Sequence, residues 1–202
     1  MSNELNYVKV LNESMQGRSP YEVLKLSVEK FFKKKIIYIC SFGSESGVIL
    51  HMISKINKNL PITLLNTNFL FEETHNYKNY LLDKFELKNF KETLPDNLDL
   101  VNMDKKNTLW KTDPDLCCKI RKVQPLNNAL KGYSAWISGK KSYHNGERKG
   151  VQFFQFLNEK IIINPLANTD MEFIKNYFEE NKIERHPLFE KGFLSVGCTH
   201  CT

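Results

Sequence analysis

Short, continuous apolar runs alternate with longer segments of helical periodicity along this chain. Three of the runs, Ile36–Cys40, Ile62–Thr67 and Ala135–Ser138, have the length and the apolar, largely β-branched character of buried strands. Helical segments follow the first two runs, from residue 47 onward and over about 71–85. Successive strand–helix units predict an α/β fold with a mostly parallel sheet flanked by helices. Ligands are therefore expected beyond the carboxyl ends of the strands, where the first two strands border one crevice.

Helices are also expected before the first strand. The apolar spacing in the first part of the chain predicts an N-terminal helical arm over 1–18. Ser19 and Glu22 then match a capping box, with Pro20 at the first helical position. The helix that begins there is expected to run to the lysines at 33–35.

The pattern is less regular between the second and third of these strands. A short strand is expected near Phe90, followed by a turn and further extended chain up to Met103. Asp113 and Pro114 are expected to open a helix, because proline suits the first helical turn. Pro125 is expected to interrupt that helix.

The last third of the chain predicts a hairpin and a further helix. The apolar runs 153–157 and 160–164 are separated by a short polar turn, as in a hairpin. Thr169 is expected to cap a helix over 170–180. No internal repeat or low-complexity linker interrupts the sequence, so a single domain over residues 1–202 is expected.

A loop of mostly small, polar residues links the first strand to its helix. The arrangement of strand, small-residue loop and helix directs backbone N–H groups and a helix N-terminus toward a phosphate. It is not the P-loop of nucleotide triphosphatases, because no Gly-Lys-Ser/Thr follows. The alternative is a plain strand-to-helix connection. The loop consists of Ser41, Phe42, Gly43, Ser44, Glu45 and Ser46.

Four of the five cysteines form two pairs, Cys117 with Cys118 and Cys198 with Cys201. Adjacent cysteines do not readily form a relaxed disulfide with each other. Two pairs brought together by folding would provide four thiolates, a set that suits an iron–sulfur cluster or a structural zinc ion. The alternative, in which the cysteines are small apolar core residues, fits poorly with their polar and charged neighbours.

Composition indicates a soluble globular protein, with 41% hydrophobic and 26% charged residues. No run approaches the roughly 20 apolar residues of a membrane span. The first residues lack the pattern of a secretory signal. Five cysteines without such a signal predict a reducing, cytoplasmic setting, in which metal ligation or catalysis is expected rather than disulfides.

Positive charge is concentrated in one part of the chain. From Asp104 to Lys149 there are eleven Lys and Arg against four Asp and Glu, a net charge of +7, while the whole chain carries +6. Such a surface suits an anionic partner. The loop after the third strand contributes Lys140, Lys141 and Arg148 as candidate anion ligands.

Three separated stretches together resemble the assimilatory sulfonucleotide reductases, particularly those that act on adenosine 5′-phosphosulfate (APS). The stretches are Ser41–Ser46, Cys117–Leu126 and Leu188–Thr202. The resemblance spans roughly residues 36–202. It implies an adenine nucleotide alpha hydrolase-like (PP-loop) domain, and the reduction of APS to sulfite and AMP in sulfate assimilation.

The resemblance also implies roles for individual residues. In that family the matching cysteines hold a 4Fe–4S cluster; zinc remains the alternative. Lys122 is then expected beside the cluster and the phosphosulfate, and Arg148 at the substrate. Thr67 belongs to a weaker match. The candidate cluster ligands are Cys117, Cys118, Cys198 and Cys201, and the candidate substrate-binding residues are Ser41, Phe42, Gly43, Ser44, Glu45, Ser46, Thr67, Lys122, Lys140, Lys141 and Arg148.

The sequence departs from the family pattern in three places, one of which is Ser142–His144, where the family usually has Arg-Asp-Gln. Family members use a further cysteine, in a C-terminal tail beyond the cluster segment, to attack the sulfur, and a dithiol protein then releases sulfite. This sequence ends at Thr202, so little sulfite release is expected from the polypeptide alone, and no catalytic residue is assigned. Cys40, at the end of a buried strand, is expected to be a poor nucleophile. Asn66 and Asn68 stand where the family usually has Asp-Thr-Gly.

Two other functions are compatible with these motifs. One is a non-reductive 4Fe–4S nucleotide-binding relative that acts as a sensor or regulatory module. The other is an RNA-modifying enzyme that adenylates a base, which is less favoured because no RNA-binding domain is evident. For a reductase, the expected partners are APS and a thioredoxin- or glutaredoxin-like protein, and some family members form homo-oligomers. Neither a membrane nor a nucleic acid is expected as a partner.

Overall fold

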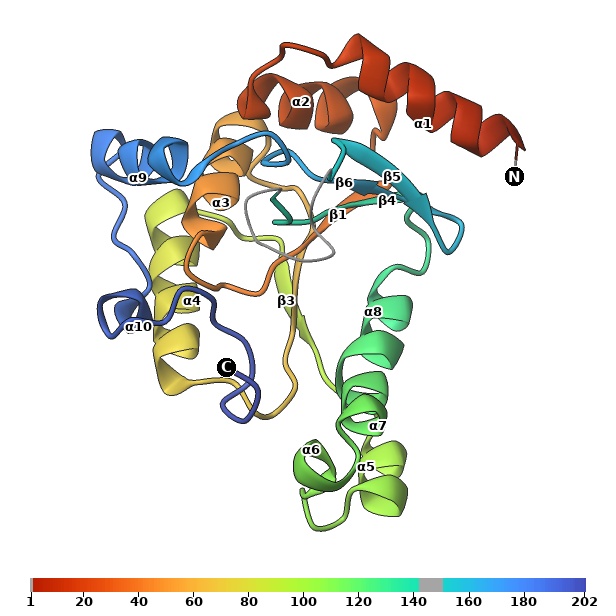
Figure 1. Ribbon diagram of the computed structural model, residues 1–202, viewed down its shortest axis with the longest axis vertical. Helices are drawn as coiled ribbons and strands as arrows, with labels where there is room; N and C mark the ends of the chain where they lie inside the picture. Colours follow the sequence, from red (N-terminus) through yellow and green to blue (C-terminus); the bar gives the residue numbers. More distant parts are fainter. Residues whose placement is uncertain (1, 142–150) are drawn as a thin grey trace.

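The computed structural model describes residues 2–141 and 151–202, and the strands in these ranges form one sheet (Figure 1). The strands are β1 (Ile36–Ile39), β2 (Ile62–Leu65), β3 (Phe90–Thr93), β4 (Ala135–Ile137), β5 (Phe154–Leu157) and β6 (Lys160–Ile163). Their order is β3-β2-β1-β4-β6-β5. All neighbours are parallel except β5 and β6, which form the expected hairpin. The prediction of an α/β fold with a mostly parallel sheet is confirmed.

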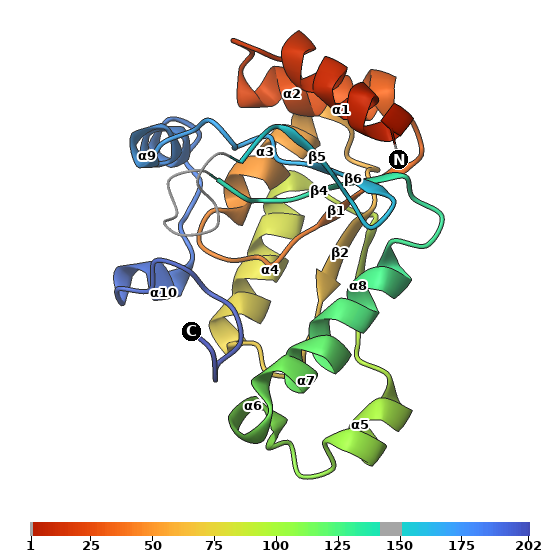
Figure 2. The ribbon, with the colours of Figure 1, turned by 45° about the vertical axis from the view of Figure 1, so that its right-hand side comes forward.

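Helices cover both faces of the sheet. They are α1 (Ser2–Ser14), α2 (Pro20–Leu26), α3 (Ser46–Ile56), α4 (Glu72–Phe85), α5 (Asn97–Met103), α6 (Leu109–Thr112), α7 (Pro114–Cys118), α8 (Gln124–Ala129), α9 (Met171–Glu180) and α10 (Pro187–Glu190). Helices α3 and α4 lie on one side of the sheet, and α8 lies on the other, against β2 and β3 (Figures 1 and 2). No helix in the described ranges has the length and apolar character that crossing a bilayer requires.

The N-terminal arm is attached to the edge of the sheet. The side chain of Asn12 donates to the carbonyl of Phe154 at 2.9 Å and accepts from the N–H of Phe154 at 3.0 Å. Helix α1 thereby satisfies backbone groups on the outer strand β5, whose free edge would otherwise be open to pairing with another chain. The capping box at the start of α2 is also confirmed, since the hydroxyl of Ser19 accepts from the N–H of Glu22 and the Glu22 carboxylate accepts from the N–H of Ser19.

Two predicted elements are corrected by the structure. The chain up to Met103, expected to be extended, forms helix α5, because the Asp96 carboxylate caps it by accepting from the N–H groups of Leu98 and Asp99. No residue of α5 is buried, so the helix lacks the core-facing apolar stripe that would have identified it. Helix α9 is capped by Asp170 rather than by Thr169, whose hydroxyl instead donates to the carbonyl of Leu166.

Pro125 does not interrupt its helix. A π-helical segment, η2 (Lys119–Val123), joins α7 to α8 into one continuous helical stretch. The N–H of Gln124 bonds five residues back to the carbonyl of Lys119, and Pro125 falls in the first turn of α8. The wider π turn therefore accommodates a residue that has no N–H, at a place where an ordinary α-helix would lose a bond and meet a clash.

Candidate functional site

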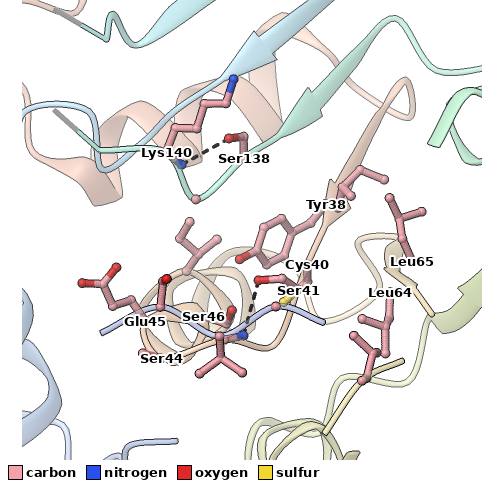
Figure 3. Close-up of a pocket in the computed structure, with 18 of the residues that line it drawn as sticks. Tyr38, Cys40, Ser41, Ser44, Glu45, Ser46, Leu64, Leu65, Ser138 and Lys140 are labelled. Atoms are coloured by element: carbon pink, nitrogen blue, oxygen red, sulfur yellow. Dashed lines mark hydrogen bonds between the residues drawn. The ribbon is translucent and has the colours of Figure 1, made fainter. Parts of the chain in front are cut away.

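A cavity of about 430 Å³ lies beyond the carboxyl ends of β1, β2 and β4 (Figure 3). Its walls come from the loop after β1, from Thr67 and Leu70 after β2, and from Ser138–Lys141 after β4. Strand β1 lies between β2 and β4, so the chain leaves β1 toward one side for β2 and returns to its other side for β4. Such reversals of strand order are where open α/β sheets bind ligands.

The loop after β1 presents polar groups to this cavity. The hydroxyl of Ser44 is buried and makes no hydrogen bond within the described residues, and so it is available to a ligand. Helix α3 begins at Ser46, and the preceding Glu45 gives no side-chain cap, which leaves the positive end of the helix open. A buried donor next to an uncapped helix N-terminus suits an anionic group.

Phe42 does not belong to the cavity wall. Its ring is fully buried and packs edge-to-face on Phe90, with ring centroids 5.7 Å apart. Its backbone has a left-handed φ of 51°, which turns the loop so that the flanking residues face the cavity while the ring enters the core. The Phe42 side chain is therefore a core residue, and a role for this loop position in substrate binding stays a prediction for its backbone.

The C-terminal segment closes one side of the cavity. Leu194–Cys198 lines it, and in Figure 3 this blue segment passes over the loop that follows β1. A Cβ atom on Gly43 would lie only 3.2 Å from the carbonyl oxygen of Val196, so glycine permits this close approach. The N–H of Thr199 donates to the carbonyl of Phe69 at 2.7 Å, which fixes the segment beside the end of β2.

The basic residues that the sequence predicts as anion ligands have different surroundings in the structure. Lys122 is half-buried in the cavity wall, and its pKa is raised, since Cys198, Cys118 and Cys201 together outweigh the lowering effect of burial. Lys122 therefore stays charged.

Lys141 also lines the cavity, but it forms an ion pair with Glu45 of the loop. Its charge is therefore shared with a carboxylate, and its role as an anion ligand stays a prediction. In Figure 3 the ammonium group of Lys140 points away from the Ser41–Ser46 loop. Arg148 lies outside the described residues.

The two cysteine pairs converge beside Lys122. Cys198 lines the cavity, and its Sγ lies 3.2 Å from the hydroxyl of Thr67. Cys118 and Cys201 also interact electrostatically with Lys122, and Cys117 does so with Cys118 and Cys201. Four soft sulfur donors from two separated segments fit an iron–sulfur cluster or zinc in their chemistry. Among the described residues, no three such side chains already stand in a metal-binding arrangement.

Arg121 is a buried side chain that bonds to residues from two other segments beside the cysteines. Its side chain is 1% exposed; one nitrogen lies 2.7 Å from the Asp104 carboxylate and another donates to the carbonyl of Thr67 at 2.9 Å. Arg121 enters the interior, whereas Lys122 reaches the cavity and interacts with Cys118, four residues before it.

The fifth cysteine is unsuited to nucleophilic chemistry. Cys40 is 1% exposed, and burial raises its pKa to about 11, against the smaller effect of a hydrogen bond from the Phe42 N–H. A thiol attacks as the thiolate, which is scarce at neutral pH for such a group. The expected burial of Cys40 is confirmed, and its weak nucleophilicity stays a prediction that this burial supports.

Comparison with known proteins identifies relatives over most of the chain. Residues 35–202 match the model of the phosphoadenosine phosphosulfate reductase domain. A protein of Mesorhizobium japonicum named adenosine 5′-phosphosulfate reductase is 34% identical over 183 residues, which is 91% of this chain and 72% of that protein. A Chelativorans protein of the same name is 36% identical over 181 residues, covering 89% of this chain and 74% of the relative.

Solved structures agree with this assignment. The crystal structure of a phosphoadenylyl-sulfate (PAPS) reductase from Candida auris, in a phosphate complex, has a TM-score of 0.81 and 25% identity, covering 98% of this chain and 96% of that one. A Candida glabrata FMN adenylyltransferase shares the fold, with a TM-score of 0.61 and 14% identity over 98% of this chain and 71% of that one. The predicted PP-loop type of fold is confirmed. The chain belongs to the phosphoadenosine phosphosulfate reductase family.

Proposed function

We propose that this chain binds APS in the cavity beyond β1, β2 and β4 and takes part in its reduction to sulfite and AMP, with a thioredoxin-type dithiol as the reductant. One observation carries the proposal: a single cavity is lined by the Ser41–Ser46 loop, by Lys122 and by Cys198. A molecule bound in this cavity would therefore face a loop that suits a phosphate, a cation and a candidate metal ligand. The relatives named adenosine 5′-phosphosulfate reductase favour APS as its substrate.

In this proposal the Ser41–Ser46 loop and Lys122 bind different parts of the substrate. The α-phosphate is assigned to the buried Ser44 hydroxyl and the open N-terminus of α3. The sulfo group is assigned to Lys122, the cation between that loop and the cysteines. The phosphate bound in the related Candida auris structure is consistent with an anion-binding fold. Apolar neighbours such as Leu64 and Leu166 then remain for the nucleoside.

We assign Cys117, Cys118, Cys198 and Cys201 to a 4Fe–4S cluster, with zinc as the alternative. A bound cluster would add its own electrostatic field beside the substrate. Lys122 would hold the sulfo group next to these ligands, since the lysine ammonium already interacts with three of the four sulfurs. The ammonium would also stabilise negative charge that develops on the oxygens of the reacting group.

The reaction requires a thiol that these residues do not supply. A thiolate would attack the sulfur of APS, the sulfur–oxygen bond to the phosphate would break, and AMP would leave with its electrons. The resulting thiosulfonate would react with a second thiolate, which releases sulfite and leaves a disulfide. Cys40 is buried and four cysteines are assigned to metal, so the attacking thiol is assigned to a group outside these 202 residues, and the reductant supplies the second thiolate.

The non-reductive alternative is less favoured, because the relatives over most of this chain carry the name of a reductase. The test is a three-part measurement on anaerobically purified protein: iron and acid-labile sulfide, APS titration, and sulfite release with thioredoxin and its reductase. Four irons per chain and saturable APS binding are expected. Little sulfite release is expected unless another chain or peptide also supplies the attacking thiol. The variant S44A is expected to weaken APS binding, with G139A as the control. Iron and nucleotide binding without sulfite release under any thiol supply would overturn the reductase assignment in favour of a sensor.

A further inference from the structure

The turn that carries the second cysteine pair makes few backbone hydrogen bonds among the described residues. Cys198 is buried, whereas Thr199, His200 and Cys201 are exposed. The described backbone bonds here are the 2.7 Å bond from the Thr199 N–H to the carbonyl of Phe69 and the 3.0 Å bond from the Cys201 N–H to the carbonyl of Cys198. Holding an exposed cysteine against a distant partner segment requires a further contact.

His200 supplies that contact through its ring. It stacks on the indole of Trp110 with ring centroids 4.2 Å apart and planes only 9° from parallel. It also meets Phe69 edge-to-face at 4.8 Å. Aromatic pairs at these separations add stabilisation beyond the area that they bury. An exposed histidine with two aromatic partners is therefore a structural anchor for the turn.

The two aromatic partners of His200 connect it to the chain before and after the double cysteine, Cys117 and Cys118. Trp110 lies on α6, the helix immediately before α7, which carries Cys117 and Cys118. Phe69 has the guanidinium of Arg121 over its ring at 4.1 Å, and Arg121 follows the double cysteine in η2. The His200 ring thus connects the second cysteine pair to residues that flank the first.

We propose that His200 is a positioning residue that holds Cys201 toward Cys117 and Cys118 by stacking on Trp110. The inference rests on the proposed role of the four cysteines as ligands of one metal centre. It assigns to His200 no proton transfer and no metal bond. The aromatic character of the side chain is what matters, so phenylalanine at this position is expected to substitute for histidine.

The first test is hydrogen exchange of the metal-free protein, followed by mass spectrometry of peptides that cover 194–202. H200A is expected to exchange roughly 10-fold faster than wild type at the Thr199 and Cys201 amides, and W110A is expected to match it. H200F should exchange at close to the wild-type rate. Equal exchange in wild type and H200A, or equally fast exchange in H200A and H200F, would overturn the proposal.

The second test uses Co²⁺ alone as a probe, because cobalt thiolates absorb visibly. H200A is expected to bind Co²⁺ roughly 10-fold more weakly than wild type, and H200F is expected to recover the affinity. Unchanged affinity in H200A would overturn the positioning role. If the wild type binds neither iron nor Co²⁺ through its thiols, the assigned metal centre fails, and with it the role of His200 toward that centre. The exchange comparison would then still show whether the stack orders the turn, so the two failures are distinguishable.

Discussion

The sulfur of Cys198 lies 3.2 Å from the hydroxyl of Thr67, which joins the second cysteine pair to the end of β2. The same hydroxyl accepts from the N–H of Phe69, and the carbonyl of Thr67 accepts from Arg121. The nucleotide cavity and the cysteine region therefore share a residue. Substitutions on either side are expected to affect both substrate binding and the cysteines.

Replacing Lys122 by methionine removes the cation between the loop and the cysteines. Since a hydrogen bond to a charged group contributes about 1.5–3 kcal/mol, APS affinity should fall roughly 10- to 100-fold. The matched control is K140M, because the ammonium group of Lys140 points away from the Ser41–Ser46 loop. Isothermal titration with APS measures both variants. Equal effects of the two substitutions would show that the lysines act only through overall charge.

The close approach at Gly43 provides a second prediction. In G43A the new methyl group would meet the carbonyl oxygen of Val196 at 3.2 Å, so the segment over the cavity must shift. Gly139 lines the same cavity, and a methyl group there would meet no atom within 4 Å, which makes G139A the matched control. APS affinity should fall about 10-fold in G43A, roughly 1.4 kcal/mol, and stay within twofold of wild type in G139A. Wild-type affinity in G43A would mean that the segment moves freely.

The buried pair of Arg121 and Asp104 provides a prediction about stability. Removing one partner leaves an uncompensated buried charge, so R121M is expected to lose about 3–5 kcal/mol in the free energy of unfolding. The double variant R121M/D104L removes both charges and is expected to regain a large part of that loss. Urea denaturation of the metal-free proteins measures both. A double variant no more stable than R121M would argue against an electrostatic cause.

His186 makes folding stability depend on pH. It is fully buried; its Nδ1 accepts from the Leu188 N–H, so its Nε2 carries the proton and donates to the hydroxyl of Thr74 at 3.1 Å. Burial lowers its pKa from 6.5 to about 4, against a small opposing effect of Glu73. The unfolded chain thus binds a proton more readily than the folded protein does.

The stability contributed by neutral His186 is fully present above about pH 6.5 and is lost as pH falls toward 4. Between pH 7 and pH 5 the loss should be about 2 kcal/mol. The variant H186Q should flatten this part of the profile, as measured by urea denaturation at each pH. An unchanged slope in H186Q would assign the pH dependence to other groups.

Much of the fold was accessible from sequence because its signals are local. Ile36–Ile39 and Ile62–Leu65 are β-branched apolar runs that must be buried, and parallel strands place the loops after them at one edge. The predicted position of the Ser41–Ser46 loop at this edge follows from that rule, and every residue of the loop except Phe42 lines the cavity there. Helix α5 was missed because its apolar residues face outward and give no core periodicity.

The contacts within the site depend on residues far apart in sequence. Lys141 was expected to bind an anion, but Glu45, nearly a hundred residues earlier, pairs with it. In the sequence, Asp104 is only one of four acidic residues within a basic stretch. In the structure, it is the buried partner of Arg121. Trp110 and His200 have no distinguishing local pattern, and their stacking depends on how the C-terminal segment docks. Pairings of this kind become visible only after the chain has folded.

The π-helical segment η2 also determines how the chain tolerates changes of length. Each residue of an α-helix turns the chain by about 100°, and a π turn holds one residue more than an α turn. Deleting a single residue between Lys119 and Val123 would let the segment relax to an ordinary α-helix while α8 stayed on the sheet. Because the π turn holds the extra residue, the double cysteine would then keep its orientation relative to α8. The chain between the double cysteine and α8 can therefore lose one residue in η2, while a deletion in α7 or α8 has no π turn to absorb it.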